Sequence, residues 1–401
     1  QCDDRYRMPD QYKKRNRTNY KRGTAMIYLD NAATTKPSKA AIAAAEEAFC
    51  TFGNPSSLHR LGLAAEKLVK KSREELAAVL HTAPANILFT SGGTESNNLA
   101  ILGYCRANAK RGKHVITTRI EHPSVLSAFA ALEKEGFSVT RLGVDSEGKI
   151  SLEEFSDALS EDTILVSVMA ANNEVGTIQP VSELKPIMRE KAKKAALHVD
   201  AVQAFGKIPL YPEKWGIDLM SVSAHKIHGM KGCGALYWKN VRLESLQYGG
   251  GQQGGMRSGT ENVPGIAAFG AAAAEIPKNN QDILKTRAAL KQKIAERIDR
   301  VVFHGSDTEQ TGYLLNASFL GVRAEVLLHM LETKEIYVST GSACSSHKPS
   351  PSHVLTAMGC SPKEIEGAIR MSFSEPLSEN EIDEVTGALT EAVAEIRKFV
   401  R

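Results

Sequence analysis

Short apolar runs alternate with longer amphipathic stretches from about residue 60 onward. The stretch Leu63–Leu80 has apolar side chains at helical spacing, which predicts a helix with one buried face. The short apolar runs predict strands at Asn86–Thr90, Lys113–Thr118, Thr163–Ala170, Ala196–Ala201, Ile217–Ala224 and Gly234–Trp238. Because helical patterns separate most of these runs, we expect an α/β fold with a mostly parallel sheet between helices.

The pattern changes after Pro264. An alanine-rich helix is followed by a charged helix near Leu284–Ile298, a strand-like run at Leu314–Leu320 and a C-terminal helix. This order is typical of a smaller α+β unit. We therefore expect a large domain over residues 26–264 and a small C-terminal domain over residues 265–401.

Charge is concentrated at the N-terminus. Residues 1–25 contain eight Lys or Arg and three Asp, a net +5, whereas the whole chain carries +4. The remainder is therefore close to neutral, which gives no electrostatic case for a nucleic-acid groove. We interpret residues 1–25 as a basic extension, either a leader or a solvated arm, with an RNA-binding tail as the alternative.

The cysteines favour an intracellular protein. The six cysteines show no C-x-x-C pair and no zinc-ligand spacing, so we expect no metal site. A long chain with scattered cysteines is typical of the cytoplasm, where we expect this protein. No apolar run approaches the roughly 20 residues of a membrane-spanning helix.

Two predicted core strands end in charged residues. Lys226 follows one of them and Asp200 ends another. Ligands of open α/β sheets bind at the carboxyl ends of the strands, and a desolvated lysine there can form a Schiff base. A carboxylate nearby would keep a pyridine nitrogen protonated, as a pyridoxal phosphate site requires. Each residue alone also has a plain structural explanation: a lysine reaching out to solvent, and an aspartate capping a helix.

Two further segments suggest phosphate binding. The stretch Ile87–Ala100 is typical of a strand, a glycine turn and a helix, and places Gly93 and Thr94 at a helix N-terminus that could bind an anion or simply form a capped turn. The glycine-rich stretch Tyr248–Gly265 contains G-x-G-x-x-G, but no helix pattern opens there, so we reject a dinucleotide site. Its Thr260 could donate to a phosphate.

Two isolated residues complete the candidates. His122 follows a predicted strand and could stack on an aromatic ring, or could be a capping or surface histidine. Cys344 lies in the stretch "VSTGSACSSHKPSPSHVL" among serines and glycines, which indicates a thiol on a loop rather than in a core. Such a thiol reacts as its thiolate.

Ten sequence blocks, taken together and in order, resemble one family. The blocks are "YLDNAATT", "FGNPSSLH", "FTSGGTESNNLAI", "EHPSV", "NNEVGTIQP", "HVDAVQ", "SAHKIHGMKG", "MRSGTENVPG", "STGSACSS" and "IRMSFS". They resemble the NifS/IscS-type cysteine desulfurases, which are fold-type I pyridoxal phosphate enzymes of the class V aminotransferase family. The sequence looks closest to the Gram-positive NifS-like desulfurases, and the resemblance covers nearly all of the chain after residue 25.

The resemblance implies a role for each matching residue. Lys226 would carry the cofactor as a Schiff base, Asp200 would contact the pyridine nitrogen, and His122 would stack on the ring. Either Lys226 or His122 would move the substrate's α-proton. The remaining cofactor contacts would come from Gln203 at the phenolic oxygen, from Asn173, and from a phosphate site of Gly93, Thr94, Ser223, His225 and the second subunit's Thr260. Asn173 and Arg370 would hold the substrate carboxylate, which an arginine can meet with two parallel hydrogen bonds.

The implied reaction assigns a role to Cys344. The thiolate of Cys344 would take the sulfur of L-cysteine, which leaves a persulfide on Cys344 and releases L-alanine. The enzyme would be a homodimer that passes the sulfur to an acceptor protein in iron–sulfur cluster assembly or tRNA thiolation. The alternatives are a selenocysteine lyase, a plain aminotransferase, a cysteine protease built on Cys344, and a non-catalytic RNA-binding module.

Overall fold

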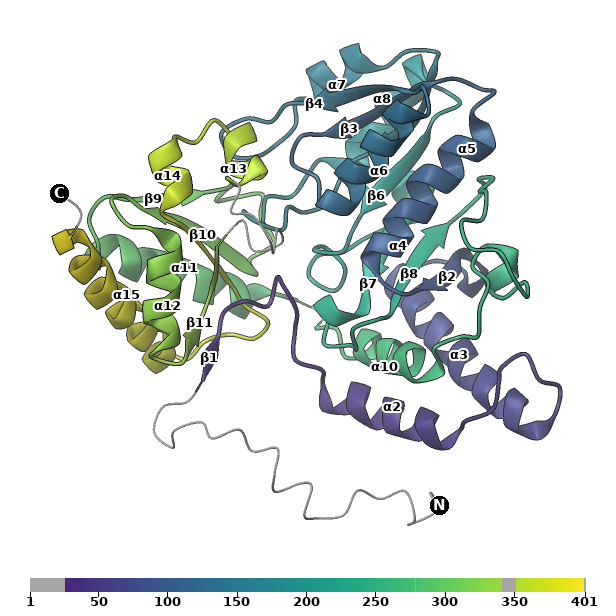
Figure 1. Ribbon diagram of the computed structural model, residues 1–401, viewed down its shortest axis with the longest axis horizontal. Coiled ribbons are helices and arrows are strands. Elements are labelled where there is room, and N and C mark those ends of the chain that lie inside the picture. Colours follow the sequence, from purple (N-terminus) through teal and green to yellow (C-terminus); the bar gives the residue numbers. More distant parts are fainter. Residues whose placement is uncertain (1–25, 278, 341–350, 400–401) are drawn as a thin grey trace.

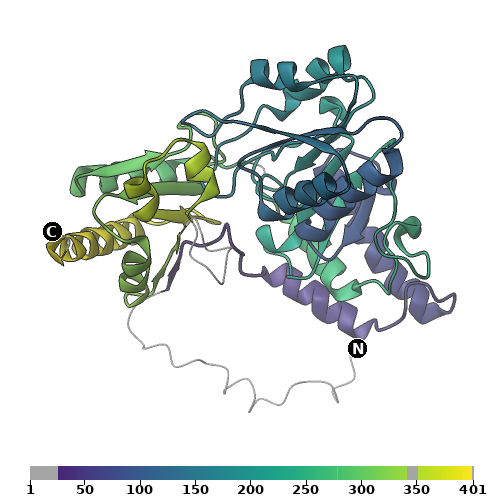
Figure 2. The same ribbon diagram turned by 45° about the horizontal axis from the view of Figure 1, so that its top comes forward.

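The computed structural model describes residues 26–277, 279–340 and 351–399. Two lobes stand side by side in both views, a larger one in purple to teal and a smaller one in green to yellow (Figures 1 and 2). Among the helices of these described ranges, none is long and apolar enough to cross a membrane.

A seven-stranded sheet forms the centre of the large lobe. Its strands lie in the order β2 (Ile87–Thr90), β8 (Gly234–Trp238), β7 (Leu219–Ser223), β6 (Ala196–Asp200), β5 (Thr163–Ser167), β3 (His114–Thr118) and β4 (Ser138–Leu142). β8 runs antiparallel to both of its neighbours, and the remaining pairs are parallel. The expected mostly parallel sheet is confirmed.

Helices cover both faces of this sheet, because the strands are apolar on both sides. One face packs against α2 (Lys39–Cys50), α3 (Arg60–Val79), α7 (Leu152–Ala158), α8 (Val181–Lys191) and α10 (Val263–Ala274). The other face packs against α6 (Pro123–Lys134) and against a continuous helical stretch made of α4 (Gly93–Asn98), a π-helical turn (Leu99–Gly103) and α5 (Tyr104–Asn108). The short helical segments are η2 (Pro84–Asn86), α9 (Pro212–Trp215), η4 (Ala224–Lys226) and η5 (Gln253–Gly255).

The small lobe has its own sheet and core. Its four-stranded antiparallel sheet has the order β12 (Ser339–Thr340), β13 (Ala368–Ser372), β10 (Leu314–Phe319) and β9 (Val301–His304). A parallel pair joins β1 (Ile27–Tyr28) to β11 (Ile336–Tyr337). The helices of this lobe are α11 (Gln281–Arg297), α12 (Ala324–Glu332), α13 (His353–Ala357), α14 (Pro362–Glu366) and α15 (Glu379–Phe399).

The division between the lobes differs from the expected boundary between residues 264 and 265. The alanine-rich α10 belongs to the core of the large lobe, where it packs on α2 and α3. Small side chains permit this close approach: a Cβ added at Gly270 would lie 2.6 Å from the Cα of Ser72. The chain therefore enters the small lobe after α10. Strand β1, at the start of the described chain, also belongs to the small lobe, where it pairs with β11.

The parallel strands determine where the site lies. β6 and β7 are neighbours in register, with Asp200 opposite Ser221, so both strands end at the same edge of the sheet. Asp200 is the last residue of β6, and Lys226 follows β7 directly in η4. The two charged residues are thus brought to one edge of the sheet.

A buried carboxyl lies at the same edge. The side chain of Glu121 is fully buried, and its Oε1 accepts hydrogen bonds from Thr118 Oγ1 at 2.8 Å and from the backbone N–H of Met169 at 2.8 Å. Burial is the main reason that the pKa of Glu121 rises to about 8. The carboxyl is therefore mostly protonated at neutral pH and joins the end of β3 to the segment after β5.

We expect Glu121→Gln to remove a pH dependence of stability. In the unfolded state the carboxyl of Glu121 has its ordinary pKa of 4.5, whereas in the folded state its pKa is about 8, so between these pH values only the folded state holds the proton. The stabilisation from this group is therefore fully present below pH 4.5 and is lost as the pH rises through about 8. The free energy of unfolding of both proteins is measured by denaturant titration at pH 5 to 8. As the pH is raised, the value for the variant minus that for wild type should increase by up to about 1.4 kcal/mol per pH unit. Two curves that run parallel across this range would contradict it.

Candidate active site

The amine of Lys226 points into the protein. Its Nζ donates to the backbone carbonyls of Ala32, at 2.5 Å, and Ala33, at 2.7 Å. These carbonyls belong to the segment that follows β1, and Lys226 also lines a cavity of about 910 Å³. The alternative of a lysine that reaches out to solvent does not fit these contacts, because the amine is held where a ligand in the cavity could meet it.

The carboxylate of Asp200 is buried and held by hydrogen bonds. Its Oδ2 accepts from Nδ2 of Asn97 at 2.7 Å, and its Oδ1 accepts from the backbone N–H of Val202 at 3.0 Å. The contact with Val202 fixes the turn after β6, but no helix begins in that turn, so the helix cap considered for this residue is not what the structure shows. The contact with Asn97 on α4 adds a fixed orientation for the carboxylate.

His122 is connected to Asp200 through two polar side chains. The same Asn97 amide also donates to Ser124 Oγ at 2.9 Å, and Ser124 Oγ lies 2.8 Å from Nδ1 of His122. The backbone N–H of Ser124 donates to the same Nδ1 at 3.2 Å, so His122 is the N-cap of α6. Because Nδ1 accepts, the proton of the neutral ring is on Nε2.

Burial keeps the ring of His122 neutral. Desolvation is the main cause that lowers the pKa of His122, the positive charge of Lys226 lowers it further, and Asp200 opposes them. A neutral imidazole can stack on an aromatic ring and donate from Nε2. The capping interaction and the proposed stacking are therefore compatible, because they use different parts of the ring.

Gln203 shares a partner with Lys226. Its Nε2 donates to the carbonyl of Ala32 at 2.9 Å, and its Oε1 accepts from Nζ of Lys207 at 2.8 Å. Since Lys226 donates to the same carbonyl of Ala32, the two side chains meet at one atom.

The residues predicted for phosphate binding also lie close together. A Cβ added at Gly93 would lie 3.8 Å from the Cβ of Ser223, so the start of α4 approaches the end of β7. Nδ1 of His225 lies 3.2 Å from Oγ1 of Thr34, and burial, followed by nearby lysines, lowers the pKa of His225 to about 4. Thr94 is exposed beside Gly93 at the helix start, where free N–H groups favour an anion.

Arg370 reaches the site from the small lobe. It lies on β13 and is 3% exposed, so an ordinary surface ion pair is excluded. Its NH1 donates to the carbonyl of Asn173 at 3.0 Å, and its NH2 pairs with Oδ1 of Asp30 at 2.8 Å. The structure thus brings together Asn173 and Arg370, the two residues predicted to bind a carboxylate.

Two predicted residues remain, Cys344 and Thr260. Cys344 lies outside the described residues, but both flanks of its segment are at the site. On one side, Ser339 of β12 is the register partner of Arg370. On the other, Ser352 Oγ donates to the Glu174 carboxylate and Nε2 of His353 lies 2.9 Å from the carbonyl of Glu121. Thr260 is exposed, and within the described part of the chain no hydrogen bond connects it to the other predicted residues.

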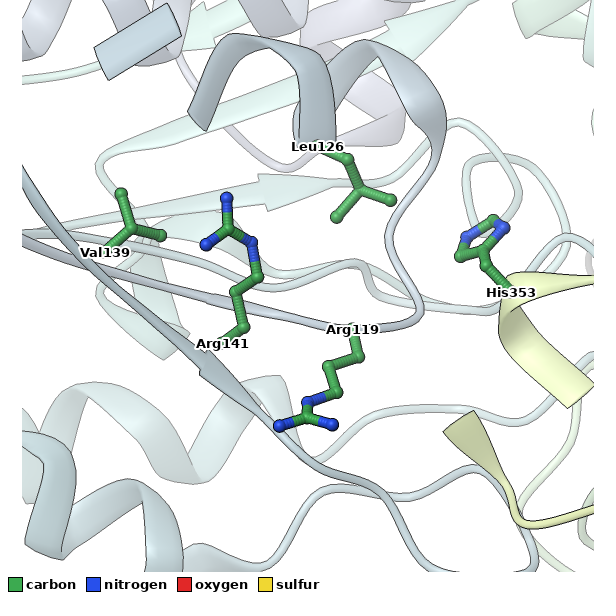
Figure 3. Close-up of a pocket in the computed structure, with 5 residues that line it drawn as sticks. All are labelled: Arg119, Leu126, Val139, Arg141 and His353. Carbon is green, nitrogen blue, oxygen red and sulfur yellow. The ribbon is translucent and has the colours of Figure 1, made fainter. Parts of the chain in front are cut away.

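An open pocket of about 510 Å³ lies next to the cluster. Figure 3 shows its lining side chains, which come from the loop after β3, from α6, from β4 and from α13: Arg119, Leu126, Val139, Arg141 and His353. Arg141 is already paired with Glu133 at 2.7 Å. Among the described residues that line this pocket, neither Lys226 nor His122 appears.

The cluster fits a polar aromatic ligand such as pyridoxal phosphate. Within the described ranges, Oγ of Ser223, Oδ1 of Asn173 and Nε of Arg370 are buried and have no hydrogen-bond partner. Buried polar atoms are normally paired, so these three are suited to ligand groups. The amine of Lys226 and the carboxylate of Asp200 supply the two functions that a pyridoxal ring requires.

Three residues of the site were missed in the sequence. Asn97, Asp30 and Lys207 hold Asp200, Arg370 and Gln203, respectively. Asn97 and Asp30 lie inside motif blocks quoted above, but nothing in the sequence singles them out from their polar neighbours. Lys207, four residues after Gln203, could have been flagged as a charge close behind a core strand.

Comparisons with known proteins agree with this geometry. The profile of the Aminotransferase class-V family matches residues 27–385. The cysteine desulfurase IscS of Methanosarcina thermophila is 42% identical over 380 residues, 93% of each chain. The NifS/IcsS protein homolog of Lactobacillus delbrueckii is 41% identical over 382 residues, which cover 93% of this chain and 99% of that one. A solved NifS-like protein has a TM-score of 0.87 and 38% sequence identity to this chain. The match covers 92% of this chain and 100% of the solved one.

These matches extend over nearly the whole chain, so the expected family and fold are confirmed. They exclude a cysteine protease and a non-catalytic module as readings of this sequence. The chain belongs to the class V aminotransferase family, and within it the protein is a pyridoxal-phosphate-dependent cysteine desulfurase of the NifS/IscS type.

Proposed function

We propose that the cluster around Lys226 and Asp200 is the desulfurase centre, and that Cys344 receives the sulfur and passes it to an acceptor protein of iron–sulfur cluster assembly or tRNA thiolation. One observation carries the proposal: the amine and the carboxylate come from the ends of neighbouring parallel strands and meet at one sheet edge. The pyridoxal ring, when bound, supplies the electron sink for the reaction.

Each residue of the cluster has a defined task toward the cofactor. Lys226 would bind its aldehyde carbon, and Asp200, oriented by Asn97, would hold the proton at the pyridine nitrogen. His122 would pack on the ring and could donate only from Nε2, because its Nδ1 is occupied by Ser124. Since that nitrogen carries a proton in the neutral ring, we assign the transfer of the substrate's α-proton to Lys226.

Arg370 binds the substrate carboxylate. Its guanidinium is held by hydrogen bonds to Asp30 and to the Asn173 carbonyl. Its Nε is buried and has no hydrogen-bond partner in the described structure. Arg370 comes from the small lobe, whereas Asn173 and the residues that hold the cofactor come from the large one. Substrate is therefore bound between the lobes.

Cys344 performs the sulfur transfer. The thiolate sulfur attacks the sulfur of the substrate, an S–S bond forms and the Cβ–S bond breaks. The electron pair left on Cβ takes up a proton, so that L-alanine is released and Cys344 keeps a persulfide. The positions of Ser339 beside Arg370 and of Ser352 on Glu174 support this role, because both flanks of the segment lie at the substrate site.

A comparison of wild type with Cys344→Ser tests this function. We expect the variant to bind the cofactor with an unchanged visible spectrum but to lose at least about a hundredfold in sulfide and alanine formation from L-cysteine, because serine cannot accept sulfur. Cys360→Ser serves as the matched control and should keep wild-type activity. If Cys344→Ser retains its activity, the sulfur-transfer role of Cys344 is wrong. If wild type binds cofactor and does not act on L-cysteine, the substrate is wrong, and selenocysteine would be tested next.

We further propose a homodimer in which Thr260 of each subunit completes the phosphate site of the other. Thr260 is exposed, and the loop that carries it is attached to α4 by the ion pair of Arg257 and Glu95 at 2.8 Å.

The dimer is checked by sedimentation at micromolar concentration. We expect twice the mass of one chain, and we expect Thr260→Ala, but not Thr260→Ser, to weaken cofactor binding severalfold, because only the alanine removes the hydroxyl donor. A monomer that retains its cofactor would contradict the proposal.

A further inference from the structure

A second lysine, Lys207, lies beside the proposed cofactor site and has no task in the reaction described above. Its Nζ donates to Oε1 of Gln203 at 2.8 Å, and it lines the same cavity as Lys226. It is carried on the turn that follows β6, so the strand that ends in Asp200 also positions Lys207.

The surroundings of Lys207 are cationic. Lys226 and Arg370 are close enough to act on it electrostatically, and in the described ranges no carboxylate forms a salt bridge with it. Its other recorded contact is with the ring of Tyr313, whose centre is 5.8 Å from Nζ. Burial and the two neighbouring cations lower the pKa of Lys207 to about 7. An ammonium in such a place costs free energy, and its one short contact is with Gln203.

That contact determines which way the Gln203 amide faces. The protonated form of Lys207, which its hydrogen bond to Gln203 favours, has only donors, so it can approach the oxygen of the amide and not its nitrogen. With Oε1 held by Lys207, Nε2 is turned toward the carbonyl of Ala32, to which it donates at 2.9 Å. The opposite orientation would place Nε2 against the ammonium and Oε1 against the Ala32 carbonyl, which are two repulsive contacts.

We propose that Lys207 is a positioning residue that holds the Gln203 amide with its nitrogen available as a donor to the phenolic oxygen of pyridoxal phosphate. This inference rests on the proposed role of Gln203. One N–H of the amide is used by Ala32, and the other remains for the cofactor. Lys207 acts through Gln203 and does not itself contact the reacting atoms.

The test uses the pH titration of the bound cofactor's visible absorbance in the substrate-free holoenzyme. A donor at the phenolic oxygen favours its ionised form, so loss of the donor should raise the midpoint of this titration. We expect Lys207→Met and Gln203→Ala each to raise the midpoint by about 0.5 pH unit or more, and Lys207→Arg, which also only donates, to raise it less. The double variant should titrate like Gln203→Ala alone.

Lys185→Met is the matched control. Lys185 is another partly buried lysine of the large lobe, paired with Asp218 at 2.5 Å and absent from the residues described for the site. Its replacement should leave the midpoint unchanged, which separates a local effect from a general loss of stability.

The outcomes distinguish the proposed role of Gln203 from that of Lys207. If Gln203→Ala leaves the midpoint unchanged, the proposed role of Gln203 is wrong, and the inference fails with it. If Gln203→Ala raises the midpoint and Lys207→Met does not, only the role of Lys207 is wrong. If Lys207→Met raises the midpoint equally with and without Gln203, the lysine acts by its charge alone and the positioning role is overturned.

Discussion

The site depends on one geometric constraint: neighbouring parallel strands end at the same edge of a sheet. β6 and β7 run side by side, so Asp200 at the end of β6 and Lys226 just after β7 are brought to the same edge without any special loop. Burial on both faces fixes the strands and hence the two charges. All other groups of the site approach this edge from elsewhere in the chain.

The backbone carbonyl of Ala32 is a second contact on which the site depends. It accepts hydrogen bonds from both Lys226 and Gln203, and it belongs to a segment that is attached to the small lobe through Asn31 and Ser372. Lys226 of the large lobe, the residue proposed to bind the cofactor, is therefore connected to the strand that carries Arg370. This connection explains how substrate recognition in one lobe can be aligned with the chemistry in the other.

Much of this arrangement could be predicted from the sequence. The positions of six strands of the large sheet followed from short apolar runs, and Lys226 and Asp200 stood out because a charge at the end of a core strand is unusual. Edge strand β4 was missed because its residues are partly exposed and lack a continuous apolar pattern. The boundary at residue 264 was misplaced because the alanine-rich α10 has no apolar face that shows which core it joins. Asn97 could not be recognised either, since its two hydrogen bonds connect residues 27 and 103 positions away in the chain.

The central claim is that Lys226, and not its neighbour Lys207, carries the cofactor. Borohydride reduction of the bound cofactor, followed by proteolysis and mass spectrometry, tests it most directly, because reduction makes the lysine linkage permanent. The account predicts the cofactor's mass on the peptide that contains Lys226. Its mass on the peptide that contains Lys207, or on neither, would contradict the account.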